Sequence, residues 1–303
     1  MNDSMFPGRV VYDLSIEKYH ADRDSISKTG LDLIDKAPAI FHAWQSPDAP
    51  ARVAKPGQLE GHLAHCAILE PEEFGKRYAV PPKNAPRKPT EAQWNAKKPS
   101  DDSIAAMEWW SAWATENQQK LPIALGQYEV AMRQAESVRA LPEIREFLSR
   151  GRAEVSGYWT DSITNVKCRC RPDFVRPLSK SSVVLLDVKT CGDASKAEFA
   201  RVAARKNYHR QDAFYSGGYG VAANVSVEKF IFIAVESEWP YAAASYELGN
   251  ESREEGFLEV HRLLDIYEEC LRTNVWPGYA DSTTTIDLPP YAFKSQEVEI
   301  GYV

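Results

Sequence analysis

The sequence of 303 residues contains no hydrophobic run that approaches the roughly 18 apolar residues of a membrane-spanning helix. Its N-terminus, MNDSMFPGRVVYDLS, lacks the basic region followed by an apolar stretch that marks a signal peptide. The composition, 44% hydrophobic and 26% charged, is that of an ordinary globular protein. We therefore expect a cytoplasmic protein that does not bind membranes.

Cysteine residues are few. There are five of them, widely scattered, and Cys168 and Cys170 stand two apart, which is the same-face spacing of a strand and not a CxxC metal motif. A cytoplasmic chain keeps its thiols reduced. We expect the cysteines to be small apolar core residues, and we expect no four-cysteine zinc or iron–sulfur site.

The chain also lacks an overall positive charge. Its net charge of −7 argues mildly against nucleic acid as a partner, because phosphate binding needs positive potential. The charge is segregated, however: five Lys or Arg residues against one Glu lie between Lys196 and Arg210. A second group of cations surrounds Asp173, namely Lys167, Arg169, Arg171 and Arg176. DNA therefore stays among the candidate partners.

The residue patterning predicts helices first, then strands and helices in alternation. Helices are expected over residues 25–36, 57–69, 102–119, 123–149, 194–204, 208–222 and 253–271. Strands are expected over residues 154–160, 166–176, 183–190, 229–235 and 242–248. This order predicts an α/β fold in which a central mixed sheet is flanked by helices, with a helical N-terminal elaboration.

We expect one domain over residues 1–303, with three parts. These are a mainly helical part (1–150), a sheet core (151–250) and a closing helix with a tail (251–303). Residues 78–100, rich in proline and lysine, are expected to form a loop or flap. The tryptophans at 109, 110 and 113 are expected to pack within the protein, with base stacking as the alternative.

The end of one predicted strand carries a candidate active site. The run Val183–Leu186 is continuously apolar, as in a strand that is buried on both faces, and Asp187 and Lys189 follow it directly. Side chains two apart on a strand point to the same side, so these two charges face one site. Asp173 ends the preceding strand, and antiparallel pairing would bring it beside Asp187. A plain ion pair at a strand end is the simpler interpretation of Asp187 and Lys189 taken alone.

Two adjacent carboxylates repel one another, and a divalent cation relieves this repulsion. Mg²⁺ suits them because it takes oxygen ligands, and we expect Mn²⁺ to substitute for it. Such an ion can polarise a phosphodiester and lower the pKa of bound water. Lys189 could orient that water or neutralise charge on the transition-state phosphate.

Other residues extend this set. Glu154 begins the first predicted strand and could supply a third carboxylate, and His65 lies on an otherwise apolar helix face. Gln211 and Tyr215, at positions i and i+4, share a helix face that follows the basic segment. Each is weak evidence alone, but together they predict the active site of a magnesium-dependent DNA nuclease.

The layout of these residues resembles the PD-(D/E)XK nuclease superfamily. Within it, the chain is similar to the nuclease domain of the exonuclease VIII (RecE-type) recombination exonucleases, which are related to lambda exonuclease. The resemblance rests on the segments SIEKYHADRDSISKTGLDLI, GHLAHCAILEPEEF, YWTDSITNVKCRCRPDFV, LLDVKT and NYHRQDAFYSGGY, which fall between about residues 15 and 220.

This resemblance implies 5′→3′ degradation of linear double-stranded DNA, which leaves a 3′ single-stranded tail for recombination by annealing. It implies a ring-shaped homotetramer and a single-strand annealing protein as partner. His65, Asp173, Asp187 and the backbone carbonyl of Val188 would hold the metal ion. The implied catalytic residues are Lys189, Glu154, Gln211 and Tyr215. Residues expected to bind DNA or phosphate are Ser27, Lys28, Arg169, Arg171, Arg205 and Arg210, with Ser27, Lys28 and Arg171 as candidates for a 5′-phosphate pocket.

Two alternatives stay open at this point. One is an endonuclease of the same fold that acts on branched or single-stranded DNA, although the four-cysteine cluster of the Cas4- and AddB-like branch is missing. The other is a catalytically silent DNA-binding module, which the presence of every presumed ligand disfavours.

Overall fold

The computed structural model describes residues 8–50, 53, 55–289 and 292. Its strands are β1 (Gly8–Val11), β2 (Tyr78–Ala79), β3 (Leu121–Pro122), β4 (Arg152–Ala153), β5 (Ser156–Thr160), β6 (Lys167–Cys170), β7 (Phe174–Pro177), β8 (Ser182–Cys191), β9 (Ser226–Glu236) and β10 (Ala243–Tyr246). Its helices are α1 (Ile16–Ala21), α2 (Lys28–Lys36), α3 (Pro38–Gln45), α4 (Gln58–Leu69), α5 (Pro71–Arg77), α6 (Glu91–Trp94), α7 (Asp101–Glu116), α8 (Leu125–Ala140), α9 (Pro142–Leu148), α10 (Lys196–Arg205), α11 (Tyr208–Ala223) and α12 (Asn250–Thr273). Within these ranges no helix is both long and apolar enough to cross a membrane.

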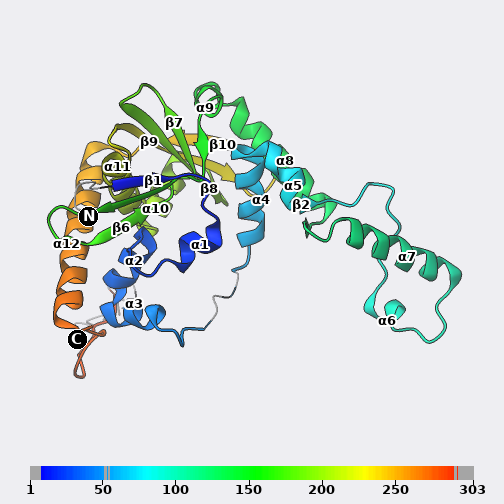
Figure 1. Cartoon of the computed structure of the whole chain (residues 1–303), viewed down its shortest axis with the longest axis horizontal. Helices are drawn as coiled ribbons and strands as arrows, with labels where there is room; N and C mark the ends of the chain where they lie inside the picture. The colour runs from blue at the N-terminus through cyan, green and yellow to red at the C-terminus, as the bar shows by residue number, and fades with distance from the viewer. Residues whose placement is uncertain (1–7, 51–52, 54, 290–291, 293–303) are drawn as a thin grey trace, which may run out of the picture.

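The largest sheet has five strands in the order β10-β9-β8-β7-β4 (Figure 1). It is mixed, because β8 and β9 run parallel while the other neighbours are antiparallel. A second sheet has the order β1-β5-β6, and β2 pairs with β3 in a small third one. The predicted architecture, a central mixed sheet flanked by helices, is confirmed.

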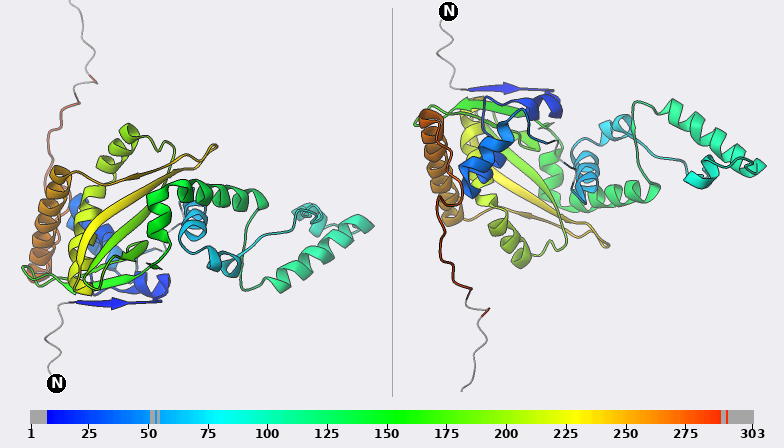
Figure 2. Two further views of the ribbon diagram at one scale, coloured as in Figure 1. Left: turned by 90° about the horizontal axis from the view of Figure 1, so that it is seen from above. Right: turned by 90° about the horizontal axis from the view of Figure 1, so that it is seen from below.

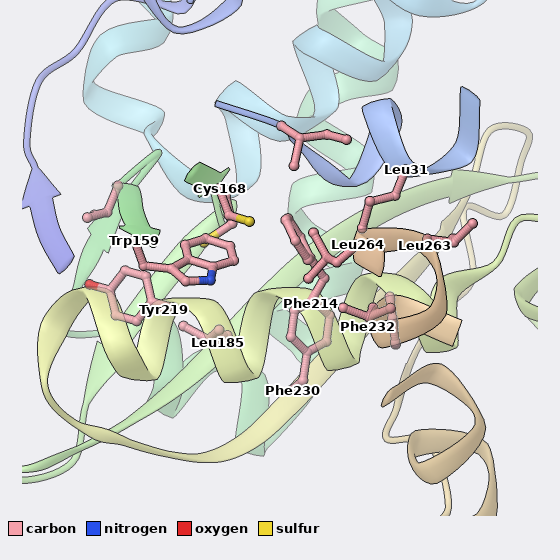
Figure 3. Packing of buried hydrophobic residues seen from close by; sticks show 14 of the residues in the cluster. Leu31, Trp159, Cys168, Leu185, Phe214, Tyr219, Phe230, Phe232, Leu263 and Leu264 are labelled. Carbon is pink, nitrogen blue, oxygen red and sulfur yellow. The ribbon is translucent and has the colours of Figure 1, made fainter. Parts of the chain in front are cut away.

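The two central strands, β8 and β9, are buried on both faces. Along each strand, alternate side chains enter opposite cores, as the pleat requires. On one face Leu185 and Phe232 pack with residues of α2, α11 and α12 (Figure 3). On the other face Leu186 and Ile233 pack with residues of α4, α8 and α9. The continuous apolar runs of these strands therefore reflect a sheet that is covered by helices on both sides.

Two elements that the patterning joined are divided by proline. The strand expected over 166–176 is split into β6 and β7, which lie in different sheets, because Pro172 between them has no N–H to donate to a ladder. The helix expected over 123–149 is interrupted: α8 ends at Ala140, and Pro142 begins α9, where its missing N–H costs nothing. Both predictions of a continuous element were wrong.

The segment expected to be a loop, residues 78–100, contains two short elements. β2 begins it, and a capping box between Thr90 and Gln93 starts α6. α6 and α7 project away from the rest of the molecule, as the two views of Figure 2 show. α7 has no buried residue, so its three tryptophans pack edge-on against one another rather than in the core.

The cysteines are free thiols, and four of the five are buried, which agrees with the prediction of apolar core residues. Residues 1–7 lie outside the described residues. In the C-terminal tail, the same holds for residues 290–291 and 293–303.

Candidate active site

The pairing of β7 with β8 brings two carboxylates together. The strands are antiparallel with Phe174 opposite Leu186, so Asp173 lies next to Asp187. Asp173 Oδ2 accepts a hydrogen bond of 2.8 Å from the backbone N–H of Val188, which fixes the side chain against β8. The adjacency predicted from antiparallel pairing is therefore present in the structure.

His65, which comes from a helix, also faces these carboxylates. It lies on α4, where its neighbours Leu63, Ala64 and Cys66 are buried in the core. Its Nδ1 is 3.4 Å from Asp173 Oδ2, and it also hydrogen-bonds the backbone of Val188. His65 thus lies beside the apolar side chains of α4 but faces the carboxylates and not the core.

Glu154 completes a cluster of three possible metal ligands. One ligand atom from each of His65, Glu154 and Asp173 lies within 4.8 Å of the others. Glu154 lies between β4 and β5, not at the start of a strand as the patterning suggested, and its φ of +55° is left-handed. Such a conformation is costly for a residue with a side chain, and it is found most often where function requires it. A backbone hydrogen bond of 2.9 Å to Asp173 O holds Glu154 in place.

Asp187 and Lys189 form a second, adjoining cluster. Asp187 is 2% exposed, and its carboxylate contacts the ammonium of Lys189 and accepts a hydrogen bond from Gln211 Nε2. Tyr215 lies one turn further along α11. It packs against the hydrophobic cluster that contains Leu185 and Phe232, and it lines the adjacent groove. The helix face shared by Gln211 and Tyr215 is therefore directed at the site.

One residue that the patterning missed is Tyr208. The Lys189 ammonium lies 4.9 Å from the centre of its ring, a favourable cation–π distance. Tyr208 begins α11, and only the folded arrangement of β8 and α11 brings it to Lys189. Nothing in its local sequence distinguishes it from a core tyrosine.

Burial and the charges of neighbouring groups shift the pKa values of the site residues. Burial raises the pKa of Asp173 well above its usual range, and the nearby charge of Asp187 raises it further. Burial also raises the pKa of Glu154. It lowers the pKa of His65 to about 4, so the imidazole is neutral at pH 7. For Lys189 burial acts to lower the pKa, but the charges of Asp187 and Asp173 outweigh it, so the pKa is raised.

These residues fit a divalent cation. Two carboxylates and a neutral imidazole offer oxygen and nitrogen ligands at one point, and burial, which raises the pKa of both carboxyl groups, disfavours their charged forms unless a cation is bound. Asp187 Oδ1 is buried, and apart from the Lys189 ammonium it has no polar partner among the described residues. The resemblance implied His65, Asp173, Asp187 and the Val188 carbonyl as ligands, whereas the side chains that converge in the structure are those of His65, Glu154 and Asp173. Asp187 contacts Lys189 and Gln211.

A groove of about 720 Å³ adjoins the site. Its walls include Ser27, Lys28, Arg171 and Tyr215. Arg171 links the groove to the ligand cluster, since its Nε donates a hydrogen bond of 2.6 Å to Glu154. Lys28 Nζ lies 2.8 Å from Asp32. The structure therefore brings together the three residues that were candidates for a phosphate pocket.

The other cations predicted to bind DNA differ in their surroundings. Arg210 is 1% exposed and forms ion pairs of 2.7 to 2.8 Å with Asp32, Asp35 and Glu259, so it is not placed to bind phosphate. It ties α11 to α2 and α12 instead. Arg169 is also buried, and its guanidinium donates a hydrogen bond to Ser25 O, although it reaches the wall of the groove.

Arg205, by contrast, is exposed. It lies at the end of α10, close enough to Tyr208 to influence its acidity. Of these three cations, only Arg205 is exposed and forms no ion pair with another residue in the described part of the chain.

Comparison with solved structures supports the fold. The crystal structure of a "Putative exonuclease" from Eubacterium rectale superposes with a TM-score of 0.52 over 92% of this chain and 97% of that one, at 11% sequence identity. At this identity the match shows the fold alone. The structure of SSO0001, also 11% identical, covers 86% of this chain and 83% of that one with a TM-score of 0.34, which carries no argument. A search of curated proteins finds no match.

The mixed sheet, with acidic residues and a lysine beside the start of β7 and the end of β8, defines a member of the PD-(D/E)XK nuclease superfamily. A family model described as "PDDEXK-like domain of unknown function (DUF3799)" matches residues 29–289. The chain belongs to this family.

Proposed function

We propose that this protein is a magnesium-dependent exonuclease that degrades linear double-stranded DNA from 5′ to 3′ and leaves a 3′ single-stranded tail. The observation that carries the proposal is the convergence of His65, Glu154 and Asp173 within 4.8 Å, beside the Asp187–Lys189 pair. Carboxylates, an imidazole and a lysine at one sheet edge suit the hydrolysis of a phosphodiester better than any redox or acyl-transfer chemistry.

His65, Glu154 and Asp173 would hold Mg²⁺, with Asp187 and the backbone carbonyl of Val188 beside them. Bound Mg²⁺ supplies a Lewis acid for the phosphodiester and lowers the pKa of its coordinated water. The protein holds Lys189 between Asp187 and the ring of Tyr208, so its positive charge faces the site. That charge is fixed before the substrate arrives and can stabilise the negative charge that develops on the phosphate. Gln211 is oriented by its hydrogen bond to Asp187.

The adjoining groove is a candidate for the 5′-terminal phosphate. Ser27, Lys28 and Arg171 line it, and hydroxyl, ammonium and guanidinium donors are those that bind phosphate. Recognition of a terminal phosphate at this position would favour a free 5′ end over an internal bond. This is why we favour an exonuclease over an endonuclease of the same fold.

The resemblance to recombination exonucleases adds two partners to this proposal. One is a second copy of the chain, in a ring-shaped tetramer around the DNA. The other is a single-strand annealing protein that receives the 3′ tail.

Digestion of linear and circular duplex tests the activity. The linear duplex carries a fluorescent label either on an internal 5′-side nucleotide or at the 3′ end, and it is incubated with and without Mg²⁺ beside a covalently closed circle. We expect release of the 5′-side label before the 3′ label, dependence on Mg²⁺, and an intact circle. Cleavage of the circle would favour the endonuclease, and failure to digest either substrate would favour the silent module.

Two variants assign the activity to the site. Lys189→Ala should lower the rate by about 10² to 10³-fold, as removal of one transition-state charge does elsewhere. Lys180→Ala, which removes an exposed lysine from the turn between β7 and β8, is the matched control and should cut at the wild-type rate. Equal rates for both variants would show that the site is assigned wrongly.

A further inference from the structure

Residues 81–120, which we call the arm, form a projection that carries α6 and α7. The arm leaves the body after β2 and returns at β3, and these two strands pair in parallel at its base. It extends away from the sheet in every view (Figures 1 and 2). The catalytic proposal uses none of its residues.

The arm has a defined internal structure. Trp110 Nε1 donates a hydrogen bond of 3.0 Å to Pro86 O, which holds the first part of the arm against α7. Gln93 Nε2 donates a hydrogen bond of 3.3 Å to Ser103 Oγ, which holds α6 against the start of α7. The side chains of α6 and of the segments around it are therefore presented from a fixed support.

Positive charge is concentrated on the first half of the arm. Residues 81–100 contain five cations and one acid, Glu91, although the whole chain has a net charge of −7. The cations are Lys83, Arg87, Lys88, Lys97 and Lys98. Of these, Lys83 lies 3.6 Å from Glu129 and Lys88 lies 5.6 Å from the centre of the Trp110 ring. Arg87, Lys97 and Lys98 form no ion pair with any other described residue.

An exposed aromatic ring lies within this basic segment. Trp94, at the end of α6, is 43% exposed, whereas Trp109, Trp110 and Trp113 are partly covered by one another. A tryptophan exposed among cations is the combination that binds single-stranded nucleic acid: bases stack on the ring, and phosphates pair with the ammonium and guanidinium groups. A duplex hides the faces of its bases, so it would leave the ring unused.

We propose that the arm binds single-stranded DNA, with Trp94 stacking on a base and Arg87, Lys97 and Lys98 contacting the flanking phosphates. This inference rests on the proposed function, because that reaction leaves one strand undigested. The arm would hold this strand away from the active site. Stacking tolerates any base, so the binding would not depend on sequence.

Binding of a 5′-fluorescein-labelled oligothymidylate of 20 nucleotides to the full-length protein in EDTA, followed by anisotropy, tests the proposal. Trp94→Ala should weaken binding about tenfold. Phe257→Ala, which removes an aromatic ring that is 56% exposed on α12, is the matched control and should bind like the wild type. Lys97→Gln with Lys98→Gln should reduce the slope of log K against log salt by about 0.7 for each phosphate that the variant no longer neutralises. Lys180→Gln with Arg272→Gln, two exposed cations outside the arm, should leave the slope unchanged.

The outcomes separate this inference from the proposed function. If wild-type protein digests linear duplex but Trp94→Ala binds the oligonucleotide like the Phe257→Ala control, the inference fails and the exonuclease stands. If Trp94→Ala changes the oligomeric mass in mass photometry, the arm is an interface between copies and the inference is overturned. If the wild type digests no DNA but Trp94→Ala still loses affinity for the oligonucleotide, the proposed function fails while the binding surface is supported.

Discussion

Asp173 and Glu154 have raised pKa values because both carboxyl groups are shielded from water, and for Asp173 the charge of Asp187 adds to the effect. In the metal-free protein their raised pKa values mean that they hold protons at pH values where ordinary carboxyls have lost them. A cation must displace those protons before it binds. Metal affinity and pH are therefore linked at these two residues.

We expect the affinity for Mn²⁺ to rise with pH above the range in which ordinary carboxyl groups ionise, because Asp173 and Glu154, whose pKa values are raised, lose their protons there. His65 adds little to this change, since its pKa of about 4 leaves it neutral throughout. Isothermal titration calorimetry in two buffers of different ionisation enthalpy should detect proton release at the lower pH values. Asp212→Asn, which removes a buried carboxyl outside the cluster, should show the same pH dependence as the wild type. An affinity that stays constant as pH rises would contradict the assignment of the ligands.

At the residue scale, the sequence predicted which side chains the pairing of neighbouring strands brings together. Asp173, Asp187 and Lys189 could be placed together because β7 and β8 are adjacent in the chain and antiparallel. The hydrogen bond from Gln211 to Asp187 could not be predicted, because Gln211 reaches the site from α11, which is distant in the chain. Nor could the burial of Arg210, whose three carboxylate partners come from α2 and α12.

At the scale of elements, α11 connects the site to the core. Its first turn carries Gln211, and its middle packs against β5 through Gly218, where an added methyl group would lie 2.2 Å from the Trp159 ring. Trp159 is itself buried and contacts Phe214 with a centroid distance of 4.8 Å, so the ring cannot move aside. The close approach of α11 to β5 therefore requires glycine at this position.

Gly218→Ala should lower the free energy of unfolding by about 1–3 kcal/mol, the cost typical of overpacking. Gly217→Ala is the control: the same helix turn has open space there, so alanine should stabilise the helix by about 0.5–1 kcal/mol. Urea denaturation followed by circular dichroism measures both. If the two variants are equally stable, α11 does not pack on Trp159 as described.

The sequence predicted most elements but not how some of them end. The apolar runs of β8 and β9 and the periodicity of α4 and α12 are local signals, and all four elements were expected. The short strands β1 and β4 were not, because each exists only through pairing with a distant partner, β5 or β7. Pro172 and Pro142 could have indicated these two boundaries, because proline has no N–H to donate. The apolar pattern continues on both sides of each proline, so one continuous element was predicted.

At the scale of the whole molecule, the body and the arm differ in how they are stabilised. Both hydrophobic clusters, as formed by the described residues, contain no residue of the arm. The cores on either side of the large sheet are built from β8, β9 and the helices that cover them. The arm depends on the body for its position, but the body does not depend on the arm for its packing.

The geometry of the base makes this difference testable. Tyr78 lies opposite Leu121 in the parallel pair of β2 and β3, so Val80 and Leu121 should be separated by about 8 Å from strand spacing and rise. Four residues of Gly-Ser linker reach up to about 16 Å and can close this gap in place of residues 81–120. The shortened chain keeps β2, β3 and every residue of the candidate active site.

We expect this deletion to change Tm by no more than about 3 °C, which corresponds to about 1 kcal/mol in a protein of this size. Linear duplex should still be digested at low salt, because Lys189 and the ligand cluster are intact, while oligothymidylate binding should weaken as in Trp94→Ala. Ile123→Ala, which truncates a buried side chain just beyond the arm, should by contrast cost about 2–5 kcal/mol and show that the assay detects core damage. Differential scanning fluorimetry compares the three proteins. A loss of stability from the deletion as large as that from Ile123→Ala would mean that the arm is part of the folded core and not an added binding element.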